Sequence, residues 1–199
     1  HVRSRRQRQM CIRDRFRPRD AIQFCNECFR VAADRPRISW RAIYAAEAHY
    51  STKRLKSLRE EWSEYYPALE TTAEILRGIV IPFTRSALAG TRLEETAMEL
   101  YELEDTDPCV IAAKNMYAPK SKVTEAEVIS RILMCLYHAG MIGIKISTLD
   151  TFVWSHIDQP RISKSEIKRA NQIKVHKMFR HALEVIDQNN ITSLGNRTR

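Results

Sequence analysis

Apolar residues recur with helical spacing after residue 17. Pro18 suits the first turn of a helix, because its missing N–H has no partner to lose there. The apolar positions that follow have i, i+3 and i+4 spacing, which predicts an amphipathic helix over residues 18–33. These positions are Ala21, Ile22, Cys25, Cys28, Phe29 and Ala32. We expect this face, with both thiols of the Cys-x-x-Cys pair, to point into a core.

A longer helix is predicted from Ser39 to Tyr66. The segment DRPRIS interrupts the first helix, and Ser39 is well placed as the N-cap of the second. No Gly or Pro follows until Pro67, which ends or bends the helix. The apolar positions that fit its stripe are Trp40, Ile43, Leu55, Leu58, Trp62 and Tyr65.

Shorter elements are predicted in the middle of the chain. The run GIVIPF reads as a buried connection. Thr124 begins a further helix with Glu127 completing a capping box, and this helix runs to His138 and stops at Gly140, a suitable C-cap. The other predicted helices are residues 68–78, 92–104 and 107–116.

The periodicity changes after Gly140. The extended runs MIGIKIS and TFVWSH flank TLD and predict a β-hairpin, and a helix ending in Gly before a two-stranded hairpin is the winged-helix order. IKVHKMFRHALEVI predicts a strand-to-helix or wholly helical segment. The expected fold is mainly α, with a helical bundle over residues 16–90, a winged-helix domain with a small β-hairpin wing over 91–188, and a polar tail over 189–199.

Composition narrows the class of protein. The chain has 199 residues, of which 44% are hydrophobic and 29% charged, as in globular proteins. Only 5 glycines are present, which disfavours turn-dense β architectures. The 5 cysteines do not resemble a disulfide framework in a chain of this size. This cysteine usage makes a reducing cytoplasm the expected compartment. No apolar run approaches the ~20 residues that span a bilayer, so we expect no membrane contact.

The net charge of +9 is unevenly distributed. Residues 1–15 hold 6 Arg and 1 Asp, which gives +5 and leaves only +4 for the remaining 184 residues. The high pI therefore describes the first segment more than the fold.

Sequence motifs for catalysis are missing. The chain has neither a GxxxxGK[ST] phosphate loop nor a GxGxxG motif, so it does not cradle a nucleotide by itself. Cys25 and Cys28 have no second metal-ligand pair, and buried structural thiols are favoured over a zinc site. His176 and His181 lack the Glu of an HExxH motif. We assign no catalytic residue and no metal ligand.

DNA binding through the predicted winged helix is one hypothesis. Its reading helix would begin with Glu125 and Glu127, whose carboxylates repel phosphate. Arg131 in this helix and Lys145 in the wing are the candidate contacts to DNA or to a protein partner. We favour packing or protein contact over DNA reading for this module.

Arg17 and Arg19 flank Pro18 at the start of the first helix. A helix N-terminus that carries Arg can meet a phosphate anion through both the helix dipole and the guanidinium group. The alternative is a solvated helix start in which Asp20 forms a salt bridge. Spacing alone favours that alternative.

Four segments carry a resemblance to a known family. They are RPRDAIQFCNECF, YSTKRLKSLREEW…YP, LYHAGMIGIK…FVWSH and VHKMFRHALEV. Over residues 16–187 the chain resembles the C-terminal region of a bacterial P-loop ATPase family related to AAA-like and STAND NTPases. The resemblance implies an N-terminal nucleotide-binding domain outside this chain, which then holds only the helical lid and winged-helix parts.

The resemblance also assigns roles to residues. An Arg at the start of a lid helix senses the γ-phosphate in AAA-like ATPases, so Arg19 is the first candidate sensor and Arg17 the second. ATP would be bound only through the N-terminal domain. Residues 1–15 have no counterpart in the family, and QMCIRDR resembles a translated sequencing adapter. We expect residues 1–15 to be non-native or disordered.

Three hypotheses result. The first is a regulatory and interaction fragment that couples the nucleotide state of an ATPase to a partner or to DNA and has no activity alone. Its contacts would be its own ATPase domain and either a protein partner or a second copy of the chain. The second is a stand-alone winged-helix DNA-binding protein. The third is a zinc protein using Cys25 and Cys28.

Overall fold

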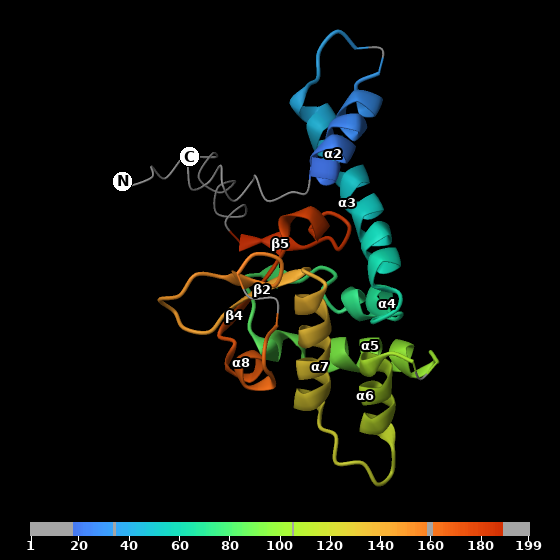
Figure 1. Ribbon diagram of the computed structural model, residues 1–199, viewed down its shortest axis with the longest axis vertical. Helices are drawn as coiled ribbons and strands as arrows, with labels where there is room; N and C mark the ends of the chain where they lie inside the picture. Colours follow the sequence, from blue (N-terminus) through green and yellow to red (C-terminus); the bar gives the residue numbers. More distant parts are fainter. Residues whose placement is uncertain (1–17, 34, 105, 159–160, 189–199) are drawn as a thin grey trace. The chain divides into compact units, whose positions relative to one another are not determined.

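The computed structural model describes residues 18–33, 35–104, 106–158 and 161–188. Across these ranges the chain is mainly helical with a few short strands, as the sequence predicts (Figure 1). The helices are α2 (Pro18–Val31), α3 (Trp40–Trp62), α4 (Leu69–Glu74), α5 (Thr91–Tyr101), α6 (Pro108–Tyr117), α7 (Glu125–His138), α8 (Lys164–Arg169) and the 3-10 turns η1 (Arg85–Leu88) and η2 (Lys177–Phe179). The strands are β1 (Val80–Ile81), β2 (Ile142–Lys145), β3 (Val153–Trp154), β4 (Gln172–Val175) and β5 (Ile186–Asp187).

Two compact units divide the chain, His1–Tyr50 and Ser51–Arg199. The hydrophobic core of the second unit extends from Leu58 to Leu183. The domain boundary that we placed at residue 90 stays a prediction.

The first unit contains α2 and the first turns of α3, which lie side by side (Figure 1). The two rings of Phe24 and Tyr50 meet edge to face with centroids 5.7 Å apart. Ser39 caps α3 as predicted, because its hydroxyl accepts a hydrogen bond from the N–H of Ala42 at 3.2 Å. Helix α3 ends at Trp62, earlier than the predicted Tyr66, and a turn precedes Pro67.

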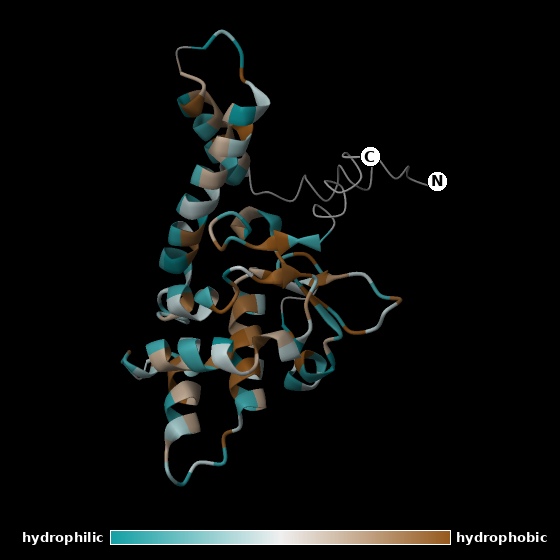
Figure 2. Ribbon diagram, turned by 180° about the vertical axis from the view of Figure 1, so that it is seen from behind, coloured by the Kyte–Doolittle hydropathy of each residue, from teal (hydrophilic) through white to brown (hydrophobic). Residues whose placement is uncertain are grey.

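The second unit is built around α7, which is brown along much of its length in Figure 2. The predicted capping box of Thr124 and Glu127 is present at its start. Gly140 follows its end with a φ of +75°, a conformation that favours glycine, so the predicted stop is confirmed. The half-buried Arg85 joins three elements by donating to the carbonyl oxygens of Ala126 and Lys168 at 3.0 and 3.1 Å.

A three-stranded antiparallel sheet with the order β3-β2-β4 follows α7. Strand β2 pairs with β3 through Gly143 and Trp154, which confirms the predicted hairpin. The third strand, β4, comes from the segment for which the sequence allowed either a strand start or a helix. A strand and the short turn η2 occur there, so the wholly helical option is wrong. The winged-helix assignment itself stays a prediction.

The GIVIPF run is a buried connection, as predicted. Ile79, Ile81 and Phe83 are buried, and Phe83 forms a β-bridge with Ile173 of β4. Strand β1 within this run pairs in parallel with β5 near the end of the described chain. This pairing joins two segments of the second unit that are far apart in the sequence.

Asp107 holds two helix starts together. Its carboxylate accepts hydrogen bonds from the N–H of Cys109 at 2.7 Å and of Ala68 at 3.0 Å, and the residue is 1% exposed.

We predict that Asp107→Ala lowers the free energy of unfolding by about 2–4 kcal/mol, because two buried N–H groups lose their acceptor. Urea unfolding monitored by circular dichroism measures this. The exposed variant Glu102→Ala is the control, and equal losses in both variants would contradict the assignment.

Candidate interaction surfaces

Helix α2 exposes most of the apolar face that the sequence assigns to the core. Ile22 is 61% and Phe29 65% exposed, and Cys25 is also exposed. The helix period is right, but the predicted orientation is wrong for these residues. Cys28 and Ala32 of the predicted face are buried as expected, and the buried side of the helix also includes Asp20 and Glu27. The pattern shows where apolar residues lie on a helix, and a neighbouring surface decides which side is covered.

Helix α3 exposes large apolar side chains as well. Trp40 is 76% and Tyr44 63% exposed, and their spacing of four residues puts them on the same side of the helix. Ala42 and Ala46 are buried. We call the exposed side chains of both helices the apolar surface of the first unit, comprising Ile22, Cys25, Phe29, Trp40 and Tyr44.

Helices α2 and α3 expose apolar side chains that a larger folded domain would normally cover. Helices that are apolar on more than one side are normally buried against several neighbours. A unit of this size also has too small an interior to be very stable alone. The arrangement therefore fits a segment that docks on another folded surface.

The two predicted phosphate sensors, Arg17 and Arg19, lie at the edge of the described chain. Arg17 lies outside the described residues. Arg19 lies in the first turn of α2, so its backbone position at a helix N-terminus agrees with the prediction, while its side chain is outside the described part. The sensor roles of Arg17 and Arg19 stay predictions.

Arg131 and Lys145, the two candidate contacts for DNA or a partner, lie on different elements. Burial raises the pKa of Tyr66 to about 12, and the positive charge of Arg131 near its hydroxyl acts in the opposite direction. That hydroxyl lies 2.8 Å from Nδ1 of His138. Arg131 is thus near the Tyr66–His138 pair, whereas Lys145 ends β2. No contact among the described residues joins the two side chains into one site.

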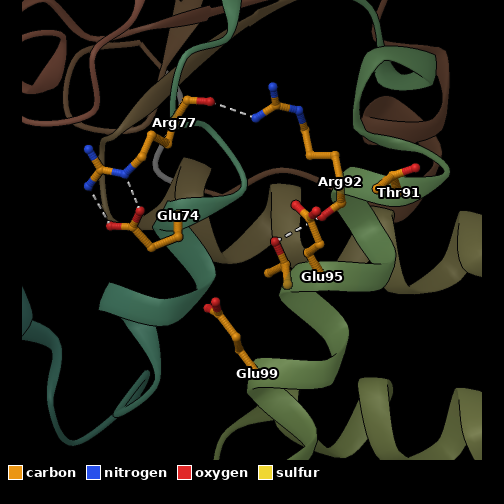
Figure 3. Close-up of a pocket in the computed structure, with 7 residues that line it drawn as sticks. Glu74, Arg77, Thr91, Arg92, Glu95 and Glu99 are labelled. Carbon is orange, nitrogen blue, oxygen red and sulfur yellow. Dashed lines mark hydrogen bonds and ion pairs between the residues drawn. The ribbon is translucent and has the colours of Figure 1, made fainter.

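A groove of about 480 Å³ lies beside α5 (Figure 3). Arg77 within it is bound by Glu74 and by Glu184, the latter at 2.8 Å. Arg92 donates to the carbonyl oxygens of Ile75 and Arg77 at 2.9 and 2.7 Å. The lining residues are Glu74, Arg77, Thr91, Arg92, Glu95, Thr96 and Glu99. Because its arginines are already engaged and carboxylates share the lining, the groove is poorly suited to a nucleotide phosphate.

The outer face of the three-stranded sheet carries rings and cations. Phe152 and Trp154 of the hairpin lie there with Lys174 and His176. Sequence reasoning identified only Lys145 on this face. The period-two patterns Phe-x-Trp and Gln-x-Lys-x-His were available signals, but they combine only after β4 is placed next to β2.

Comparison with known protein families gives one match. Residues 3–59 match a family described as the FunZ-associated C-terminal helical domain. The matched range contains α2 and most of α3 and overlaps the segment 1–15 that we expect to be non-native. It is consistent with a helical C-terminal domain of a larger protein. No curated protein and no solved structure matches the chain.

Within the described ranges, no group of three or more His, Cys, Asp or Glu side chains is arranged to hold a metal ion. Among the helices that the structure describes, none combines the length and the apolar character needed to cross a bilayer.

Proposed function

We propose that this chain is the C-terminal regulatory and interaction region of a P-loop ATPase, and that α2 and α3 dock on the nucleotide-binding domain. The single observation that carries the proposal is the apolar surface of the first unit. The family match supports it, because the matched family is described as a FunZ-associated C-terminal helical domain. The chain would be inactive alone, and ATP would be bound by the nucleotide-binding domain.

The position of Arg19 gives the proposed coupling a physical basis. Docking of α2 would bring its N-terminus, with Arg19 in the first turn, toward a bound triphosphate. A guanidinium group and a helix dipole both favour contact with the terminal phosphate. Helix α3 continues across the boundary between the two compact units.

We also propose that the second unit contains a winged-helix arrangement. Helices α5, α6 and α7 pack in succession, and the β2–β3 hairpin follows α7. The exposed Glu125 and Glu127 at the start of α7 favour a protein contact over DNA reading by this helix. Duplex DNA binding through Arg131 and Lys145 is the alternative.

Substitutions on the apolar surface test the docking proposal. Phe29→Ser and Trp40→Ser should each weaken binding to the nucleotide-binding domain by roughly tenfold or more, because large aromatic anchors dominate interfaces. Binding is measured by titration calorimetry between the chain and that domain, with helicity checked by circular dichroism.

The matched controls replace exposed polar residues of the same helices. Gln23→Ser and Arg41→Ser should leave the affinity within about twofold, since neither removes apolar contact area. Equal losses in all four variants would refute docking through the apolar surface. ATP hydrolysis by the purified chain alone would refute the regulatory role.

A further inference from the structure

Strand pairing aligns a set of side chains on the outer face of the sheet. Gly143 of β2 lies between Trp154 of β3 on one side and Lys174 of β4 on the other. Directly paired residues point to the same face of a sheet, and so do residues two positions apart. Lys145 and His176 therefore share this face with Trp154 and Lys174. Ile142, Ile144 and Ile173 point to the other face and are buried in the core.

Gly143 lets the indole of Trp154 lie directly against the backbone of β2. A Cβ atom built on Gly143 would lie 2.5 Å from Cε2 and 2.7 Å from Cδ2 of Trp154. The indole therefore packs directly against the backbone at Gly143. This packing fixes the orientation of the ring before a ligand binds, which lowers the entropic cost of stacking on it.

Two imidazole rings pack beside Trp154. The ring centroids of Trp154 and His176 are 5.2 Å apart and perpendicular, and those of Trp154 and His156 are 6.1 Å apart. Phe152 lies on the same face, because Nζ of Lys174 is 5.8 Å from its ring centroid. Phe152 and Trp154 are partly exposed and His156 is exposed.

Basic side chains gather beside these rings. Arg180 and Lys177 lie close enough to Lys174 to add to the effect of burial, which lowers its pKa most, while Asp187 acts in the opposite direction. Asp187 is itself bound by Arg180 at 2.7 Å. Lys145 adds a cation from β2. The outward positions of the three strands contain no carboxylate.

We propose that this face binds single-stranded nucleic acid, with bases stacked on Phe152 and Trp154 and phosphates bound by Lys145 and Lys174. Rings supply flat surfaces that accept any base, and interspersed lysines follow a phosphate backbone. A duplex keeps its bases stacked inside and cannot use the rings in this way. The site is separate from the apolar surface of the first unit, so it does not rest on the proposed docking function.

The test measures fluorescence anisotropy of labelled oligothymidine and oligouridine of about 12 nucleotides, with a duplex of the same length as the comparison. The full chain should bind the single strands more tightly than the duplex. Lys145→Gln and Lys174→Gln should each weaken single-strand binding about three- to tenfold, and Trp154→Leu about tenfold. Lys120→Gln, which changes an exposed residue elsewhere, should leave it unchanged.

A second measurement separates this face from the arginine-rich segment 1–15. Photo-crosslinking with oligonucleotides that contain 5-iodouridine should label Phe152 or Trp154. The lysine variants keep the test valid even if Trp154→Leu unfolds the sheet. Crosslinks confined to residues 1–15, tighter binding of the duplex, or equal weakening by Lys120→Gln and Lys145→Gln would each overturn the proposal.

Discussion

Gly143→Ala is expected to destabilise the protein by about 1–3 kcal/mol, although a Gly to Ala change within a strand normally stabilises. The added Cβ would lie 2.5 Å from the ring of Trp154, closer than two carbons can approach. Either the indole must move away from the backbone of β2, or strands β2 and β3 must move apart. Urea unfolding at pH 7.5 measures the change in the free energy of unfolding.

A double-mutant cycle with Trp154→Ala identifies the cause of this loss. Without the indole, the methyl group of Gly143→Ala has room, so the second substitution should cost little in the Trp154→Ala background. A full loss in both backgrounds would show that backbone conformation, rather than contact with Trp154, requires glycine at this position.

His176 is expected to make the protein sensitive to mild acid. Burial, with His156, Arg180 and Arg54 nearby, lowers the pKa of His176 from 6.5 to about 3. The native state therefore keeps the imidazole neutral, whereas the unfolded chain takes up a proton below pH 6.5. The stabilisation is fully present above pH 6.5 and is lost as the pH falls toward 3. At pH 5 the loss reaches about 2 kcal/mol at most.

The measurement compares urea unfolding at pH 7.5 and pH 5.0 in three proteins. His176→Phe keeps a ring next to Trp154 and Phe179 but does not titrate, so it should lose less stability between the two pH values than the wild type. The exposed control His49→Gln should behave as the wild type does. An unchanged pH dependence in His176→Phe would assign the acid sensitivity to other groups.

The sequence predicted local signals well, because their partners are neighbours in the chain. Ser39 and Thr124 mark helix starts through groups within four residues of themselves, and Gly140 marks an end through its own backbone conformation. The β2–β3 hairpin was predictable for the same reason. Strand β4 was less certain, because its pairing with β2 joins segments about thirty residues apart.

The orientation of α2 was not predictable from its periodicity. The exposed stripe of Ile22 and Phe29 and the buried side with Asp20 and Glu27 are both compatible with a helical pattern, and packing against α3 selects between them. The sheet face around Trp154 was missed for a related reason. Its rings and lysines come from three strands, and no single segment of sequence contains them together.

Site-specific photo-crosslinking tests the central claim most directly. Phe29→p-benzoylphenylalanine and the control Gln23→p-benzoylphenylalanine place the same probe about 120° apart around α2 in the full-length protein, and both positions are exposed. We predict a crosslink from position 29 to a peptide of the nucleotide-binding domain, and little or none from position 23. Crosslinks from position 29 only to a second copy of this chain, or equal crosslinking from both positions, would contradict docking of the apolar surface on that domain.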